Sequence, residues 1–172
     1  DKFISSCKNV EDLFEKISGV SPSVLKGDYF ERFCQIYLLI TPEYQLKLDN
    51  VWRNEEIPSK IKKKLNLPRD DEGVDLLVQT TSGEFWSIQC KYRSDQDKAL
   101  TYKELSTFTT LSFNSAKNIS HGIVMHTSYK PIRKRKLLKN ISYIDQSRWI
   151  NFDDHWQELQ AFCQHKRKIL KP

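Results

Sequence analysis

Long hydrophobic runs are missing from this sequence of 172 residues. The most apolar short stretch, residues 36–40, is flanked by polar residues and falls far short of the roughly 18 residues that a membrane span needs. The N-terminus also lacks the basic, then apolar, then small-residue order of a signal peptide. These absences exclude a membrane-spanning protein, and they favour a cytoplasmic setting.

Metal-binding cysteine and histidine motifs are missing as well. The four cysteines, Cys7, Cys34, Cys90 and Cys163, lie far apart, without a CxxC pair or a nearby histidine at zinc-ligand spacing. The four histidines likewise form no cluster of the HNH type that supplies a histidine general base in some nucleases. A structural zinc site is therefore excluded, and free, mostly buried thiols are expected.

The composition is that of one folded, basic domain. Hydrophobic residues make up 38% and aromatic residues 12%, enough for a core that disordered chains cannot form. The 28 Lys and Arg exceed the 22 Asp and Glu, giving a formal charge of +6. The basic residues cluster at 60–64, 130–139 and 166–171, which suits a nucleic-acid backbone, although each run alone is also typical of a solvated helix face.

The order of predicted elements indicates an α/β fold. A hairpin is expected from two runs of branched and aromatic residues joined by Thr81, Ser82 and Gly83. We expect residues 43–70 to be irregular or partly helical. The alternation of helices and strands predicts a central mixed sheet with helices on both faces. Helices are predicted at 10–17, 22–40, 101–116 and 153–169, strands at 74–80, 84–92, 122–127 and 141–144, and a basic helix or turn at 131–139.

Three polar residues on the predicted hairpin carry the chemistry. Side chains alternate along a strand, so Gln89 and Lys91 share a face, and antiparallel pairing about Ser82 brings Asp75 opposite residue 89 or 90. A lysine in an otherwise apolar strand needs an anionic partner. Oxygen donors beside an ammonium group suit Mg²⁺ and a scissile phosphate.

This pattern resembles the PD-(D/E)xK nuclease superfamily, and its GxD and QxK form resembles the Mrr-like branch. The matching residues are Gly73, Asp75, Gln89 and Lys91, with Glu31 on the preceding helix. The resemblance implies a PD-(D/E)xK fold and Mg²⁺-dependent hydrolysis of double-stranded DNA, with Mn²⁺ able to substitute. It also implies that Lys91 aligns the nucleophile. The implied metal ligands are Glu31, Asp75, Gln89 and the backbone carbonyl of Cys90.

Contacts with DNA are expected from basic and polar residues around this site. The candidates are Lys26, Tyr92, Arg93, Thr101, Arg133, Lys134, Arg135 and Lys136. For several of these a surface role is an equal alternative. No recognisable base-reading motif is present, so the amino-acid sequence does not indicate which DNA sequence would be recognised.

The amino-acid sequence around the QxK motif, from Trp86 to Tyr92, is similar to that of the N-terminal nuclease domain of type ISP restriction-modification enzymes. That similarity implies a larger parent polypeptide carrying a helicase-like ATPase and a methyltransferase. We therefore expect an N-terminal helical segment at 1–21, an Mrr-like nuclease core at 22–150, and a helix at 151–172 that leads to a following domain. Two alternatives stay open: a non-catalytic nucleic-acid-binding module of the same fold, or a nuclease for branched DNA or RNA.

Overall fold

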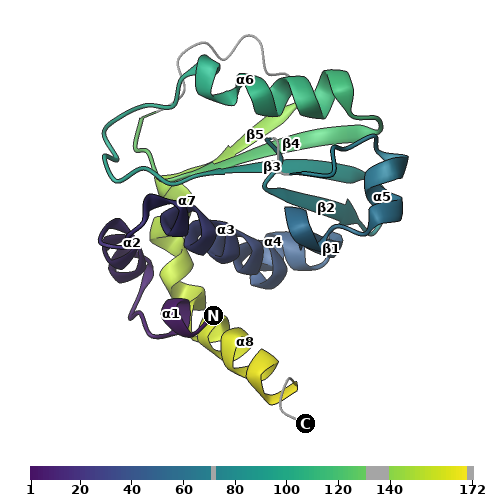
Figure 1. Cartoon of the computed structure of the whole chain (residues 1–172). Coiled ribbons are helices and arrows are strands. Elements are labelled where there is room, and N and C mark those ends of the chain that lie inside the picture. The colour runs from purple at the N-terminus through teal and green to yellow at the C-terminus, as the bar shows by residue number, and fades with distance from the viewer. Residues whose placement is uncertain (71–72, 131–139, 170–172) are drawn as a thin grey trace.

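A five-stranded mixed sheet forms the centre of the fold (Figure 1). The structure is a computed structural model that describes residues 1–70, 73–130 and 140–169. The strands lie in chain order, with antiparallel pairing from the first to the third and parallel pairing from the third to the fifth. This arrangement confirms the predicted mixed sheet. The strands are β1 (Leu48–Arg53), β2 (Leu76–Thr80), β3 (Phe85–Lys91), β4 (Ile119–His126) and β5 (Ile141–Ile144).

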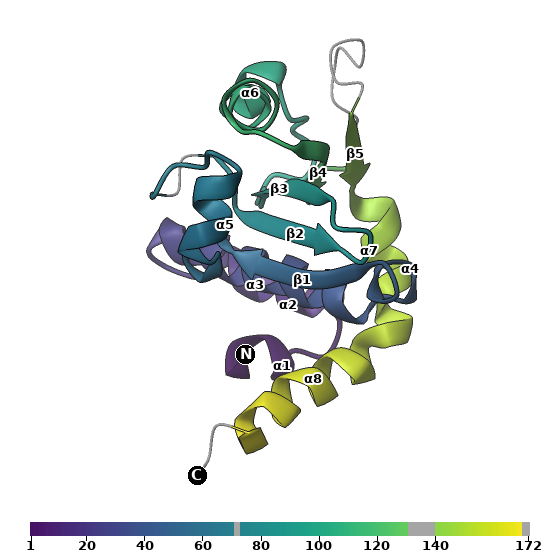
Figure 2. The same cartoon turned by 90° about the vertical axis from the view of Figure 1, so that its right-hand side faces the viewer.

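Helices cover both faces of the sheet, as predicted, with α3 on one side and α6 on the other (Figure 2). The short helix α5 lies on the α6 side, because Leu65 at its end packs against Leu77 of β2. Within the described residues, no helix combines the length and the apolar character needed to cross a membrane. The helices are α1 (Lys2–Ser5), α2 (Val10–Ser18), α3 (Ser23–Ile40), α4 (Pro42–Gln45), α5 (Ser59–Lys64), α6 (Tyr102–Thr110), α7 (Gln146–Phe152) and α8 (Trp156–Ile169).

The main hydrophobic core lies between the sheet and α3. Strand alternation sends Ile88 and Cys90 of β3 into this core and turns Gln89 and Lys91 to the opposite face. Both ends of the chain join the same core, since α1 and α8 contribute fully buried residues to it. The Trp156 indole N–H donates to the Cys7 carbonyl oxygen at 2.9 Å, which fixes α8 against the N-terminal segment.

Strand β1 is the main element that the sequence did not predict. It lies in the stretch expected to be irregular, and it pairs with β2 through Val51 opposite Val78. Only Val51 of its six residues is buried, and Asp49 is exposed. An edge strand that mixes polar and apolar residues on both faces lacks the alternation by which strands are recognised. The partly helical expectation for the same stretch is met by α5.

Several helix boundaries also differ from the predictions. Helix α6 ends at Thr110 rather than near residue 116, and α8 begins at Trp156 rather than at residue 153. Helix α3 begins at Ser23 with Pro22 as its N-cap, one residue later than expected. The predicted final helix is preceded by α7, which begins earlier because the Asp145 carboxylate caps it by accepting the Ser147 backbone N–H at 3.0 Å. The basic stretch at 131–139 lies outside the described residues.

Candidate active site

The hairpin register places Asp75 beside Gln89 at the open end of β2 and β3. Leu76 pairs with Ile88, and the Asp75 backbone N–H donates to the Ile88 carbonyl oxygen at 2.9 Å. The tight turn that sets this register contains Gly83, whose φ of +86° favours glycine. The structure thus brings together the two residues that the sequence predicted to meet.

The Asp75 carboxylate orients both neighbouring groups of β3. Its Oδ2 atom accepts the Cys90 backbone N–H at 2.7 Å and the Gln89 side-chain N–H at 3.1 Å. The Asp75 and Gln89 side chains are each only 8% exposed. Because Gln89 donates its amide N–H to Asp75, its amide oxygen is the atom that could bind a metal ion.

The Cys90 carbonyl lies on the β2 side of β3. Backbone carbonyls alternate in direction along a strand, so the Cys90 carbonyl points to the same side as that of Ile88, which accepts the Asp75 N–H. Strand β2 begins at Leu76, and the Cys90 carbonyl lies beyond this start. A second oxygen donor therefore faces the open end of the hairpin.

Lys91 is the last residue of β3, and its side chain is half-buried. It pairs with His126 of β4, and its carbonyl oxygen accepts the Thr127 N–H at 3.3 Å. Alternation puts Lys91 on the face of Gln89. Burial lowers the pKa of the neighbouring His126 imidazole below its usual value of 6.5, so His126 adds no positive charge beside Lys91 near neutral pH.

Glu31, the predicted fourth ligand, lies on α3, where it is half-buried. Its charge and that of Asp75 both act on two buried thiols, Cys34 of α3 and Cys90 of β3. Burial is the main cause of the raised pKa of each thiol, and the two carboxylates raise it further. The two carboxylates therefore lie within electrostatic reach of one pair of thiols, and a shared metal site for Glu31 and Asp75 stays a prediction.

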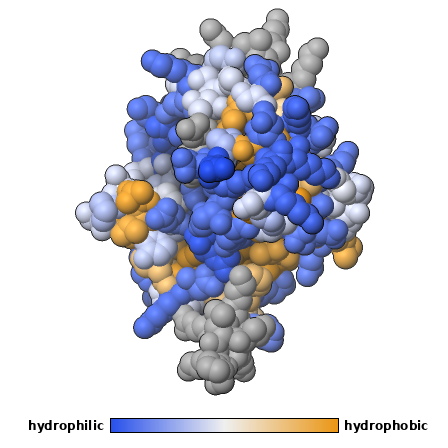
Figure 3. Space-filling view, turned by 45° about the vertical axis from the view of Figure 1, so that its right-hand side comes forward, coloured by the Kyte–Doolittle hydropathy of each residue, from blue (hydrophilic) through white to orange (hydrophobic). Residues whose placement is uncertain are grey.

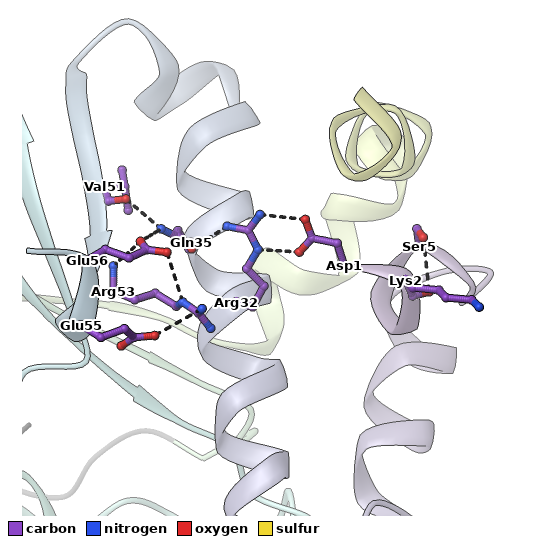
Figure 4. Close-up of polar contacts among 9 residues, drawn as sticks. All are labelled: Asp1, Lys2, Ser5, Arg32, Gln35, Val51, Arg53, Glu55 and Glu56. Atoms are coloured by element: carbon purple, nitrogen blue, oxygen red, sulfur yellow. Dashed lines mark hydrogen bonds and ion pairs between the residues drawn. The ribbon is translucent and has the colours of Figure 1, made fainter. Parts of the chain in front are cut away.

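Polar contacts fix the helix that carries Glu31 (Figure 4). The next residue, Arg32, donates from Nε and Nη2 to the Asp1 carboxylate at 2.7 and 2.9 Å. One turn later, the Gln35 amide N–H donates to the Val51 carbonyl oxygen at 2.9 Å and to Glu56 at 2.8 Å. The Arg32 contacts tie α3 to the N-terminus, and the Gln35 contacts hold α3 against β1 and the turn that follows it.

Gly73 shapes the loop that leads into Asp75. Its φ is +112°, and a Cβ atom there would lie 3.1 Å from Cγ2 of Thr107 on α6. A side chain would therefore be strained by the backbone conformation and crowded by α6. This explains the glycine of the GxD pattern. Asp71 and Glu72, just before it, lie outside the described residues.

Asn54 belongs to the site region, although no sequence pattern indicated it. Its backbone N–H donates to the Asp75 carbonyl oxygen at 3.1 Å, and its side-chain N–H donates to the Val74 carbonyl oxygen at 3.0 Å. Asn54 thus holds the backbone on both sides of the Val74–Asp75 peptide. It follows the unpredicted strand β1, and a lone asparagine in a polar stretch carries no motif that could have revealed it.

The residues predicted to contact DNA have varied surroundings. The Tyr92 hydroxyl donates to the Phe14 carbonyl oxygen at 2.7 Å, and the Arg93 guanidinium forms an ion pair with Glu104. Thr101 caps α6, and Lys26 is half-buried on α3. Arg133, Lys134, Arg135 and Lys136 lie outside the described residues. Contact with DNA stays a prediction for all eight.

The donors at this site are those that Mg²⁺ prefers. They are the carboxylates of Glu31 and Asp75, the Gln89 amide oxygen and the Cys90 carbonyl, all hard oxygen ligands. Across residues 1–70, 73–130 and 140–169, no three His, Cys, Asp or Glu side chains are placed to hold a metal ion together. A metal at this site would therefore need the amide and carbonyl oxygens, with water or phosphate completing its coordination.

The mixed sheet, and the hairpin that sets Asp75 beside Gln89 and before Lys91, define a nuclease domain of the PD-(D/E)xK class. A family model described as "Restriction endonuclease" matches residues 39–151, more than half of the chain. The chain belongs to this family of Mrr-like restriction endonucleases.

A solved structure shares the fold. It is the "ATP-dependent Type ISP restriction-modification enzyme LlaBIII bound to DNA", matched with a TM-score of 0.59 and 21% sequence identity. The match covers 80% of this chain and 8% of that chain. The comparison with curated proteins gave no match.

Proposed function

We propose that this domain is a Mg²⁺-dependent endonuclease that hydrolyses phosphodiester bonds of double-stranded DNA. The observation that carries the proposal is the pair of hydrogen bonds to Oδ2 of Asp75, at 2.7 Å from Cys90 N and 3.1 Å from Gln89 Nε2. These two bonds hold a carboxylate, an amide oxygen and a strand carbonyl at one end of the hairpin. Membership of a restriction endonuclease family supports the assignment.

Each residue of the site has a role in this proposal. Asp75, Gln89 and the Cys90 carbonyl would bind Mg²⁺, and Glu31 would bind the metal or one of its water molecules. When bound, Mg²⁺ would lower the pKa of a coordinated water and offset charge on phosphorus. The Lys91 ammonium would align the attacking water and stabilise the negative charge that grows on the phosphate oxygens. Mn²⁺, which accepts the same oxygen ligands, is expected to substitute.

The parent protein is proposed to be a large cytoplasmic restriction-modification enzyme. The matched LlaBIII structure is described as ATP-dependent and bound to DNA, and the match covers 8% of its chain. A helicase-like ATPase and a methyltransferase would then belong to the same polypeptide, with residues 22–150 as the nuclease core. Each active site would cut one strand, so a double-strand break would need two copies.

Metal binding and cleavage by variants of Lys91 and Asp75 test this proposal. Lys91→Ala should bind Mg²⁺ in calorimetry like the wild type, yet cut plasmid DNA about 10²- to 10³-fold more slowly, because it loses only transition-state stabilisation. Asp75→Asn should lose both metal binding and cleavage. Asp49→Asn makes the same change at an exposed position of β1 and should lose neither.

Other outcomes would point to the alternatives. A wild-type protein that binds DNA but takes up neither Mg²⁺ nor Mn²⁺ would be a non-catalytic binding module. Faster metal-dependent cleavage of branched DNA or of RNA than of linear duplex DNA would replace the proposed substrate. Cleavage by Lys91→Ala at the wild-type rate would remove Lys91 from the catalytic set.

A further inference from the structure

A polar groove lies beside the site, between the end of β1 and helix α5. Its volume is about 910 Å³. Figure 3 turns the side of the molecule that carries α5 forward, and this face is mainly hydrophilic with small apolar patches. The groove is lined chiefly by polar and charged residues, among them Asn54, Ser59, Lys62, Lys63, Asn66 and Arg69.

Two connections place this groove next to Asp75. Asn54, at one end of the groove, donates its backbone N–H to the Asp75 carbonyl oxygen at 3.1 Å. Leu77, two residues along β2 and on the same face as Asp75, packs in a cluster with Ile57 and Leu65, which flank α5. The groove and the Asp75 side chain therefore lie on the same face of the sheet.

Lys62 braces the wall of the groove. Its ammonium donates to Oδ1 of Asn54 and to the Arg69 carbonyl oxygen, each at 2.9 Å. One half-buried side chain therefore links α5, the end of β1 and the segment that leads toward Asp75. This linkage sets the width of the groove and the position of the backbone at Arg69.

The charges in the groove favour an anionic ligand. Lys63 and Arg69 are exposed, and within the described part of the chain neither has a carboxylate partner within 4.0 Å. The acidic Glu55 on the groove wall is paired with Arg53 at 3.3 Å. The exposed Asp70 also lines the groove, so its lining holds three cations, Lys62, Lys63 and Arg69, against the two carboxylates of Glu55 and Asp70. The excess charge of the lining is therefore positive.

We propose that this groove binds the phosphate backbone of the DNA strand that enters the active site. Lys63 and Arg69 contact its phosphates, and Lys62 is a positioning residue that holds the groove open. The assignment of DNA as the ligand rests on the proposed function. An open groove with exposed lysine and arginine side chains suits the DNA phosphate backbone, which is bound through its charge and without readout of the bases. Such binding also gives a role to Lys62 and Lys63 of the lysine run at 60–64.

The salt dependence of DNA binding tests this proposal. Binding of a short fluorescein-labelled duplex is followed by anisotropy in EDTA, where no cleavage occurs, from about 50 to about 200 mM KCl. Each phosphate contact contributes about 0.9 to the slope of log affinity against log salt, so Lys63→Ala/Arg69→Ala should reduce the slope by about 2. Lys2→Ala/Lys8→Ala removes the same charge from exposed residues of the N-terminal segment and should leave the slope nearly unchanged.

The outcomes separate this proposal from the proposed function. The groove proposal would be overturned by an unchanged slope in Lys63→Ala/Arg69→Ala, or by a reduction of the slope equal to that in Lys2→Ala/Lys8→Ala. Either result would count against it even if the wild type cuts DNA in Mg²⁺. A slope reduced only in the groove variant supports the groove even if the wild type cuts nothing. Lys63→Arg/Arg69→Lys keeps both charges and should restore the slope, which excludes a folding defect as the cause.

Discussion

Replacement of Asn54 by alanine should destabilise the fold more than an ordinary polar substitution. The Asn54 side chain is 9% exposed and makes two hydrogen bonds, to the Val74 carbonyl oxygen at 3.0 Å and from Lys62 at 2.9 Å. Losing the first leaves a buried carbonyl without its partner, which costs about 1–3 kcal/mol. Losing the second costs less, about 0.5–1 kcal/mol, because Lys62 is half-exposed and keeps its bond to Arg69.

Together these losses should lower the free energy of unfolding by about 1.5–4 kcal/mol. The assay is urea denaturation followed by tryptophan fluorescence. Asn50→Ala is the matched control, because Asn50 lies on β1, the strand that Asn54 follows, and makes a half-buried bond to Gln79 at 3.1 Å. It should cost about 0.5 kcal/mol. Equal losses for the two variants would refute the view that Asn54 anchors the backbone at Asp75.

Three further changes test neighbouring parts of the structure. Thr101→Ala should cost about 1 kcal/mol in urea denaturation by removing the N-cap of α6, while Thr101→Ser should cost little. Tyr92→Phe removes the hydroxyl bond to Phe14 and should lower the free energy of unfolding by about 1 kcal/mol; no loss would mean that this bond adds nothing. Burial lowers the pKa of His126, so the unfolded chain takes up this proton first as the pH falls. Between about pH 7.5 and about pH 5.5 the wild type should therefore lose more stability than His126→Asn; equal losses would contradict this.

The hairpin and its site could be predicted because they depend on short-range rules. The two-residue period of a strand puts Gln89 and Lys91 on one face, and the glycine-containing turn fixes Asp75 opposite Gln89. Helix α6 was foreseen from the Thr101 and Glu104 capping box, which is present. Glu31 was found by resemblance to a family, since a helix residue at the edge of an apolar stripe has no chemical signature of its own.

The region between α4 and β2 could not be predicted, and it holds Asn54 and the groove. Strand β1 is an edge strand with one buried residue, so its sequence shows no alternation. The roles of Asn54 and Lys62 come from contacts across 20 and 8 residues of sequence, respectively, which no local pattern encodes. Tertiary contacts therefore decide this part of the site.

The central claim is that Asp75 holds the metal needed to cut DNA. Supercoiled plasmid incubated with the wild type in Mg²⁺ should be nicked and linearised, and EDTA should stop the reaction. Asp75→Asn, which keeps the shape of the side chain but removes its charge, should leave the plasmid supercoiled, while Asp49→Asn should cut like the wild type. Equal cleavage by Asp75→Asn and the wild type in Mg²⁺ would contradict the account.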